Sequence, residues 1–162
     1  PYQFPEKLIP KMVSNILANK DLPIYAKGKN SREWLHVLDH CEALFMLYLK
    51  GKSGESYNIG SGTNIKNIDL VKKILKIFKF NKIYKKNKII FVKDRPGHDF
   101  RYALNSNKIF KDLKWKAKIE INSGLSKTIK WYLKNNDFLS RISKKIYEKR
   151  IGLKRWLKKE LF

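Results

Sequence analysis

The chain has 162 residues, of which 43% are hydrophobic and 13% aromatic, and its formal net charge at pH 7 is +23. This length and apolar content suit one globular domain with a sizeable core and exclude a largely disordered chain. The sequence shows neither a signal-peptide pattern nor an apolar run of about 18 residues or more, so we expect a cytoplasmic protein that does not span a membrane.

The positive charge has two explanations. A basic surface gains affinity for nucleic acid by releasing counterions from phosphates, which makes a nucleic-acid-binding or anionic-surface-binding module one interpretation. Arginine, however, occupies only six positions, whereas lysine is scattered through every segment together with much asparagine and isoleucine. These three residue types share A/T-rich codons, so a biased genome and solvated faces explain the charge as well, and we favour that explanation.

Strands and helices alternate along the chain, which indicates an α/β or α+β architecture. Hydrophobic spacing and turn residues predict, in chain order, a helix at 8–17, strands at 22–25 and 34–37, a helix bearing Ala43, Leu44, Leu47 and Tyr48, a strand at 56–59, a helix bearing Val71, Ile74, Leu75 and Phe78, a buried strand at 89–92, and helices at about 106–113 and 123–135. We assign residues 1–137 to a small mixed α/β domain. Residues 138–162 form a basic amphipathic helical tail, which covers the protein's own surface, contacts a subunit or lies on anionic lipid.

Local signals refine these elements. Asp39 and Asn67 stand where helices begin and are expected to cap them, because short polar side chains accept hydrogen bonds from free N–H groups. Pro10 is tolerable in the first turn of its helix. Cys41 is the only cysteine and lies in an apolar helical run, so we expect a reduced, buried thiol. The lysine-rich stretch 82–88 is predicted to be a loop.

A polar cluster follows the last expected strand. Residues 94–99 read Asp-Arg-Pro-Gly-His-Asp, and the end of a strand is where sheet proteins commonly keep their ligands. Arginine grips phosphate oxygens with two N–H groups, histidine adds a donor, and Gly97 lets the backbone approach a ligand closely. Asp94 and Asp99 are expected to hold the cations in place. Taken alone, the six residues fit a surface turn with internal ion pairs equally well.

A second arginine stands at the start of another expected strand. Residues 31–37 read Ser-Arg-Glu-Trp-Leu-His-Val, and strand alternation places Arg32, Trp34 and His36 on one face. Arginines from two strand ends with an aromatic ring nearby suit a diphosphate attached to a flat base, because the phosphates need paired cations and the base needs a stacking partner. We therefore predict a single site that uses both Arg32 and Arg95.

Two weaker patterns favour structural roles. His36, Asp39 and His40 straddle an expected strand-to-helix boundary without any metal-ligand spacing, so we predict no metal site there. The stretch at 60–62 reads Gly-Ser-Gly, but no third glycine follows at the right place for a dinucleotide fingerprint. We expect no cofactor site within this chain.

Beyond these features, the chain resembles the C-terminal half of the dTDP-glucose 4,6-dehydratases, a family of extended short-chain dehydrogenase/reductases. The matching stretches are 1–10, 22–25, 32–37 with 39–40, 57–60, 66–69, and 94–99 followed by 101–103. They occur at nearly family spacing up to residue 137, and the Arg-Pro-Gly-His-Asp sequence is typical of this family rather than of its epimerase and decarboxylase relatives. His36 departs from the pattern, since relatives often have tyrosine there.

The resemblance implies a small mixed α/β substrate-binding lobe with a nucleotide-sugar site. The residues that correspond by position to the family's substrate contacts are Lys7 and Leu8 at the nucleotide wall, Pro23, Ile24 and Tyr25 at the thymidine edge, Arg32 and Asn67 near ribose and diphosphate, and Asp94, Arg95, Pro96, Gly97 and His98 at the phosphate clamp.

The resemblance also implies what this chain does not hold. Full-length members use bound NAD to convert dTDP-glucose to dTDP-4-keto-6-deoxyglucose, and their NAD-binding Rossmann half and catalytic residues precede the stretch with which this chain begins. We therefore expect no catalytic residue here and an isolated chain that is inactive, because no hydride acceptor is positioned beside the sugar. The implied partners are a dTDP-sugar, a separate N-terminal half and a second copy in a homodimer. A related nucleotide-sugar epimerase or dehydratase is the alternative.

Overall fold

The computed structural model describes residues 1–83, 86–135 and 137–141. Its elements are α1 (Leu8–Leu17), β1 (Leu22–Tyr25), β2 (Ser31–Glu33), α2 (Val37–Lys50), β3 (Asn64–Lys66), α3 (Asn67–Phe80), β4 (Ile89–Val92), α4 (Asn107–Leu113), α5 (Ile121–Lys134) and α6 (Asp137–Arg141). The expected mixed α/β architecture is confirmed. The predicted bounds of α1, β1 and β4 are confirmed as well, and the predicted tail lies outside the described residues after Arg141.

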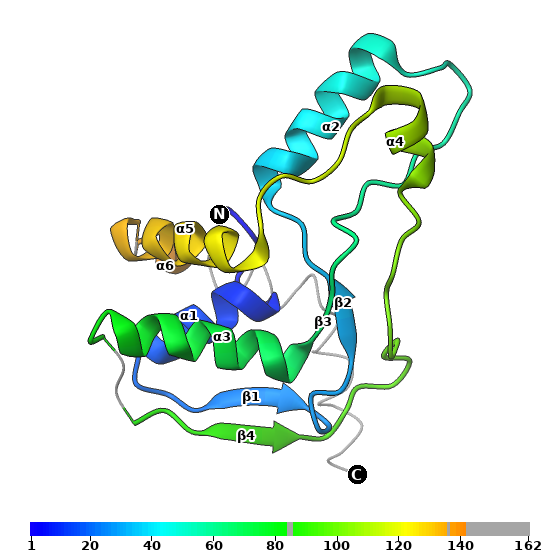
Figure 1. Cartoon of the computed structure of the whole chain (residues 1–162). Helices are drawn as coiled ribbons and strands as arrows, with labels where there is room; N and C mark the ends of the chain where they lie inside the picture. Colours follow the sequence, from blue (N-terminus) through cyan, green and yellow to red (C-terminus); the bar gives the residue numbers. More distant parts are fainter. Residues whose placement is uncertain (84–85, 136, 142–162) are drawn as a thin grey trace.

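The larger part of the fold is a two-stranded parallel sheet covered by helices. β1 and β4 pair in parallel with Leu22 opposite Ile89, and α1 and α3 lie over one face of this sheet, with α5 above them (Figure 1). Leu22 and Ile24 alternate toward that face and are almost completely buried. The main hydrophobic core lies between the helices and β1 and includes Met12 from α1 and Phe78 from α3.

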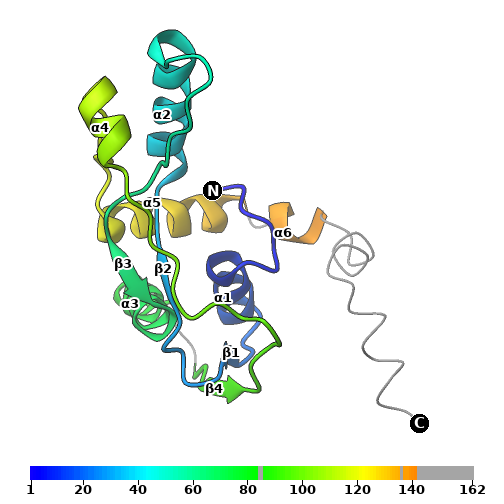
Figure 2. The same ribbon diagram turned by 90° about the vertical axis from the view of Figure 1, so that its right-hand side faces the viewer.

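A smaller part projects from this layer. β2 and β3 pair antiparallel and lead away from the sheet toward α2 and α4, which stand together at the far end in both views (Figures 1 and 2). A second, smaller core holds this part together, with Ala43, Ile109 and Trp115 as its fully buried members. The molecule therefore has one well-covered layer and one thin extension.

Two of the strand predictions were wrong: one strand lies at a different position, and the other does not form. The strand expected at 34–37 lies earlier, as β2, and α2 already begins at Val37, so Trp34 does not alternate with Arg32 on a sheet face. Residues 56–59 form no strand, because no described segment pairs with them through a ladder of backbone hydrogen bonds. The strand at 89–92 is confirmed but is not buried as expected: Phe91 is 58% exposed.

The cap of α2 is His36 rather than Asp39. The His36 ring atom Nδ1 accepts a hydrogen bond from the backbone N–H of Leu38 at 3.3 Å. Asp39 lies inside the first turn, where its buried carboxylate accepts from the backbone N–H groups of Lys118 and Ile119 at 3.2 and 2.9 Å. The carboxylate thus ties α2 to the segment before α5, because a buried acceptor needs such donors.

Three further expectations are corrected. Asn67 is the first residue of α3, and the N-cap position belongs to Lys66, which makes no side-chain cap hydrogen bond. The Cys41 thiol is exposed rather than buried. Leu44 and Tyr48, expected on the inner face of their helix, are 50% and 84% exposed. Among the described residues, no helix is long and apolar enough to cross a membrane.

Gly28 fixes the turn between β1 and β2. Its φ is +67°, and a Cβ there would lie 2.8 Å from Cβ of Ile68 and 2.9 Å from Cγ2 of Ile24. We expect Gly28→Ala to lower the free energy of unfolding by about 2–3 kcal/mol, since it adds left-handed strain and a clash. Gly54→Ala is the matched control, because Gly54 also has a positive φ but no atom within 4 Å of the added methyl group. Urea denaturation of both variants measures the difference, and equal losses would contradict the steric explanation.

Candidate nucleotide-binding site

The site forms where the carboxyl ends of β1 and β4 meet the beginning of α3 (Figure 1). The turn after β1 lies against this helix: the backbone N–H of Ile68 donates to the carbonyl of Gly28 at 3.1 Å, and that of Asn67 donates to the carbonyl of Asn30 at 2.8 Å. Gly28 permits this approach because it has no side chain. The residues that follow β1 and β4 are thereby brought to one edge.

The loop after β4 is held against the start of β2. The backbone N–H of Ser31 donates to Phe100 O at 2.8 Å, and the N–H of Tyr102 donates to Ser31 O at 3.1 Å. The amide of Asn30, which is 3% exposed, donates to the carbonyl of Asp99 at 3.3 Å. Two stretches about 70 positions apart in the sequence are therefore adjacent.

Arg32 fastens this loop with its guanidinium group. Its Nη2 donates to the carbonyl of Asp99 at 2.8 Å, and its Nη1 donates to the carbonyl of Ser31 at 2.7 Å. The guanidinium carbon lies 4.4 Å from the centroid of the Tyr102 ring, in a cation–π arrangement. Both Nη atoms of the Arg32 guanidinium thus donate to backbone carbonyls, while the positive charge of the guanidinium remains at the surface of the loop.

His98 is positioned by two neighbours. Its Nδ1 lies 2.6 Å from Oδ1 of Asp94, and its ring meets that of Tyr25 edge to face with centroids 5.7 Å apart. The His98 side chain is only 7% exposed. The hydrogen bond with His98 is the main cause that lowers the pKa of Asp94, with the nearby charge of Arg95 adding to it. The Asp94 carboxylate therefore orients the imidazole, whereas the sequence analysis expected both Asp94 and Asp99 to hold the cations of this loop.

Arg32 and Arg95 act on the same part of the surface. The pKa of Tyr102 is raised, chiefly by its short hydrogen bond to the carboxylate of Asp99, while the positive charges of both arginines oppose this shift. The Arg32 guanidinium lies over the Tyr102 ring, and Arg95 belongs to the same loop, seven residues before Tyr102 in the sequence. Arg95 itself is exposed, and its backbone N–H donates to Asp94 Oδ1 at 2.9 Å.

The space beside Gly97 is free of other protein atoms. Its φ is +64°, which glycine adopts without strain, and an added Cβ would have no heavy atom within 4 Å. A ligand group at this turn can therefore approach the backbone closely.

The remaining predicted site residues lie at other positions. Lys7 and Leu8 are at the start of α1, where the Lys7 ammonium lies 3.8 Å from Oε1 of Glu6. Pro23 is in β1 opposite Ile90, and Ile24 beside it points into the core with 2% exposed, so that it supports Tyr25 from behind. Oδ1 of Asn67 is buried and has no hydrogen-bond partner among the described residues.

Sequence reasoning chose the wrong aromatic ring and missed three polar residues. Trp34 packs against the main core, and the ring beside Arg32 is that of Tyr102, while the ring beside His98 is that of Tyr25. Asn30, Tyr102 and Glu33 join the loop to β2, with Glu33 accepting hydrogen bonds from the backbone N–H groups of Gly62 and Leu104 at 2.6 and 2.9 Å. No local signal marks them, because each acts through a segment that is distant in the sequence.

The lowered pKa of Asp94 predicts that strong acid releases the loop that carries His98. Its folded-state pKa is lowered, so its interaction with His98 is fully present above the unfolded pKa near 3.8 and is lost as pH falls through the lower folded value. We expect the His98 ring to keep its fixed orientation at pH 3.8 and to lose it only as the pH falls further, through the lowered folded-state pKa of Asp94. An NMR titration of the His98 ring measures this. Asp94→Asn should remove the acid step, and a step that persists in this variant would contradict the assignment.

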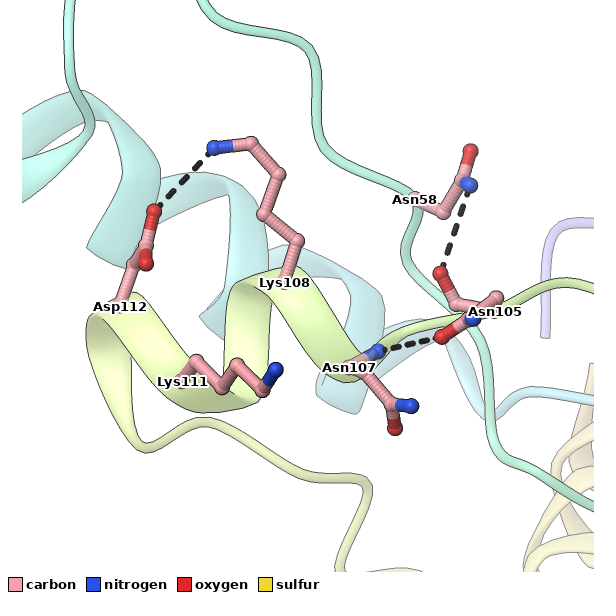
Figure 3. A pocket seen from close by; sticks show the side chains of 6 residues that line it. All are labelled: Asn58, Asn105, Asn107, Lys108, Lys111 and Asp112. Atoms are coloured by element: carbon pink, nitrogen blue, oxygen red, sulfur yellow. Dashed lines mark hydrogen bonds and ion pairs between the residues drawn. The ribbon is translucent and has the colours of Figure 1, made fainter.

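A separate pocket of about 500 Å³ lies between the chain around Asn58 and helix α4 (Figure 3). Its lining residues are Asn58, Asn105, Asn107, Lys108, Lys111 and Asp112. Its polar groups bond one another: the Asn58 amide donates to Asn105 O at 3.4 Å, and the ammonium group of Lys108 lies 3.2 Å from Oδ2 of Asp112. None of these residues belongs to the arginine site. Across the described ranges, no cluster of His, Cys, Asp and Glu side chains suits a metal ion.

Comparisons with known proteins agree with the resemblance in the sequence. The family model described as GDP-mannose 4,6 dehydratase matches residues 1–128. A probable dTDP-glucose 4,6-dehydratase of Sinorhizobium fredii is 43% identical over 157 residues, which are 94% of this chain and 45% of that relative. dTDP-glucose 4,6-dehydratase 1 of Escherichia coli K12 is 44% identical over 151 residues, which are 91% of this chain and 42% of that relative. The chain thus spans less than half the length of these relatives.

Solved structures lead to the same family. The dTDP-glucose 4,6-dehydratase of Bacillus anthracis, crystallised with NAD, is 42% identical with a TM-score of 0.80 and matches 88% of this chain and 44% of its own. The Streptomyces venezuelae enzyme, with NAD and TYD bound, is 36% identical with a TM-score of 0.81 over 88% of this chain and 43% of its own. The chain belongs to the GDP-mannose 4,6 dehydratase family and matches the C-terminal portion of the dTDP-glucose 4,6-dehydratases.

Proposed function

We propose that this chain forms the nucleotide-sugar-binding part of a dTDP-glucose 4,6-dehydratase, which converts dTDP-glucose to dTDP-4-keto-6-deoxyglucose. The observation that supports this proposal most is that Arg32 donates through Nη2 to the carbonyl of Asp99 and so holds the loop that carries Arg95 and His98. Two cations beside one open turn are what a diphosphate requires. The proposed ligand therefore lies across the loop after β4.

Each residue of the loop has a distinct role in this proposal. Arg95 is exposed, so its full fork is available for two phosphate oxygens. His98 presents Nε2 to the ligand, because its Nδ1 lies 2.6 Å from Oδ1 of Asp94, and Nε2 donates to a phosphate oxygen when the imidazole is protonated. Arg32 holds the loop in place through the carbonyl of Asp99 and adds positive charge. Tyr25 presents its ring, which is 47% exposed, to the thymine base.

The described residues do not fit NAD. The Gly60–Gly62 turn leads into the short strand β3 rather than into a helix, so this turn offers no helix N-terminus to a pyrophosphate. What this chain supplies to the reaction is binding and orientation of the nucleotide sugar.

Titration of the 162-residue chain with dTDP, UDP and GDP, followed by calorimetry, tests the proposal. We expect dTDP to bind with the highest affinity and to shift the NMR signals of Tyr25 and His98. GDP binding in its place would assign the chain to a different nucleotide sugar of the same family. Duplex DNA at two salt concentrations is the control: strongly salt-dependent DNA binding without any response to dTDP would contradict the proposal and favour a nucleic-acid-binding module.

A further inference from the structure

Two tyrosines of this chain share one local arrangement. Each donates its hydroxyl hydrogen to an aspartate and has a cation over its ring. The two sets, which we call the Tyr57 group and the Tyr102 group, are Tyr57 with Asp112 and Lys108, and Tyr102 with Asp99 and Arg32. The cation lies 4.2 Å from the ring centroid in the Tyr57 group and 4.4 Å in the Tyr102 group. The groups differ in what the carboxylate does to the cation.

In the Tyr57 group the cation is paired with carboxylates. The Lys108 ammonium lies 3.2 Å from Oδ2 of Asp112, which is also the atom that accepts from the Tyr57 hydroxyl (Figure 3). It lies 3.2 Å from Oε2 of Glu55 as well. Two carboxylates at this distance neutralise one ammonium. The Tyr57 group therefore fastens the chain before Asn58 to α4, and its cation has no net charge to offer a ligand.

In the Tyr102 group the cation is held by neutral groups instead. Arg32 donates to the backbone carbonyls of Ser31 at 2.7 Å and of Asp99 at 2.8 Å. It also donates to the carbonyl of Phe100 at 3.5 Å. Among the residues that the structure describes, no carboxylate oxygen forms an ion pair with the Arg32 guanidinium. Because carbonyls and an aromatic ring carry no net charge, Arg32 keeps its full positive charge.

Arg32 also keeps donors for a ligand. A guanidinium group has five N–H donors, and the three backbone carbonyls take one each. Two donors are left without a partner in the described part of the chain, which is the number that one bidentate phosphate contact uses. Arg32 therefore combines a fixed position with an unneutralised charge and spare donors.

The carboxylate best placed to neutralise Arg32 is that of Asp99. The backbone carbonyl of Asp99 already accepts from Nη2 of Arg32, so a rotation of the Asp99 side chain brings its carboxylate toward the guanidinium. In the structure this carboxylate accepts from the Tyr102 hydroxyl instead. That hydrogen bond is the main cause that lowers the pKa of Asp99, and the charge of Arg32 contributes less. The Asp99 carboxylate is thus directed to the tyrosine and not to the arginine.

We propose that Tyr102 is a positioning residue of the diphosphate site: its ring supports the Arg32 guanidinium, and its hydroxyl holds the Asp99 carboxylate away from it, so that the charge of Arg32 stays available to a phosphate group. Tyr102 acts through Arg32 rather than through a contact of its own with the ligand. This inference deepens the proposed function and rests on it.

Removing the hydroxyl group tests this role. Tyr102→Phe keeps the ring under Arg32 but releases the Asp99 carboxylate, which then pairs with the guanidinium. We expect the Kd for dTDP, measured by calorimetry on the 162-residue chain, to rise about three- to tenfold. Tyr57→Phe is the matched control, because it removes the same kind of hydrogen bond beside a cation that is already neutralised. Its Kd should stay within about twofold.

A second substitution separates this role from a purely structural one. Asp99→Asn removes the carboxylate but keeps the backbone carbonyl that Arg32 binds. Alone, it should change the Kd for dTDP by less than about twofold, and combined with Tyr102→Phe it should restore the Kd to within about twofold of that of the unchanged chain. If Tyr102 served only to keep the loop folded, the double variant would bind no better than Tyr102→Phe, and that result would overturn the inference. Circular dichroism checks that each variant is folded.

A measurement without ligand keeps this inference distinct from the proposed function. The NMR signal of the Nε–H group of Arg32 should shift in Tyr102→Phe, where the guanidinium gains a carboxylate partner, and should return in the double variant. In a chain that does not bind dTDP, these shifts would refute the diphosphate ligand but support the role of Tyr102. A signal that does not move in Tyr102→Phe, in a chain that does bind dTDP, would refute the role of Tyr102 and leave the proposed function standing.

Discussion

Replacing Arg95 by lysine should weaken dTDP binding by about 1–3 kcal/mol, or roughly 5- to 150-fold in Kd. The guanidinium of Arg95 is exposed beside the Gly97 turn, where no protein atom would crowd a ligand. Lysine keeps the charge but replaces a two-pronged donor with a single ammonium, so the loss measures the geometry of the contact rather than its charge. Calorimetric titration of the variant with dTDP gives the change in Kd.

Arg101→Lys is the matched control for this experiment. Arg101 lies in the same exposed loop and pairs with Ser31 through its backbone, so the substitution has the same chemistry without removing the proposed phosphate contact. We expect its effect on dTDP affinity to stay within a few tenths of a kcal/mol. Equal losses in the two variants would show that the loop binds anions unspecifically, and an unchanged Kd in Arg95→Lys would refute the clamp.

Replacing Phe78 by alanine should lower the free energy of unfolding by about 3–5 kcal/mol, because it removes a buried ring and leaves a cavity that its neighbours fill only in part. Phe78 is completely buried and joins α3 to residues of α1 and β1 in the main core. This loss is a large fraction of the 5–15 kcal/mol that is typical of a folded domain. Urea denaturation followed by circular dichroism measures it as a fall in the midpoint concentration.

The control for this substitution lies two residues away on the same helix. Phe80 is 88% exposed, so Phe80→Ala removes the same ring without creating a cavity. We expect a change within about 0.5 kcal/mol. If both alanine variants lost the same stability, the main core would have to lie elsewhere than between α3 and the sheet.

The local elements followed from the sequence wherever the chain pairs a clear pattern with clear ends. α1 has helical spacing of apolar residues with Pro10 in its first turn, and β1 and β4 are short apolar runs bounded by turn residues, so their bounds were predicted correctly. The pattern was insufficient in α2, because a helix that is apolar on both sides does not reveal which side is covered. It also failed at 56–59, where strand propensity is present but none of the described segments pairs with these residues.

The amino-acid sequence by itself determined the family, the mixed α/β class and the two arginine clusters of the proposed site, since residue type and spacing are local properties. Only the tertiary structure decided that β1 pairs with β4, that Arg32 fastens the loop holding Arg95 and His98, and that Tyr102 rather than Trp34 lies beside Arg32. The physical reason is that these contacts join stretches about 70 positions apart. Their formation depends on chain reversal and core packing, which no short stretch of sequence specifies.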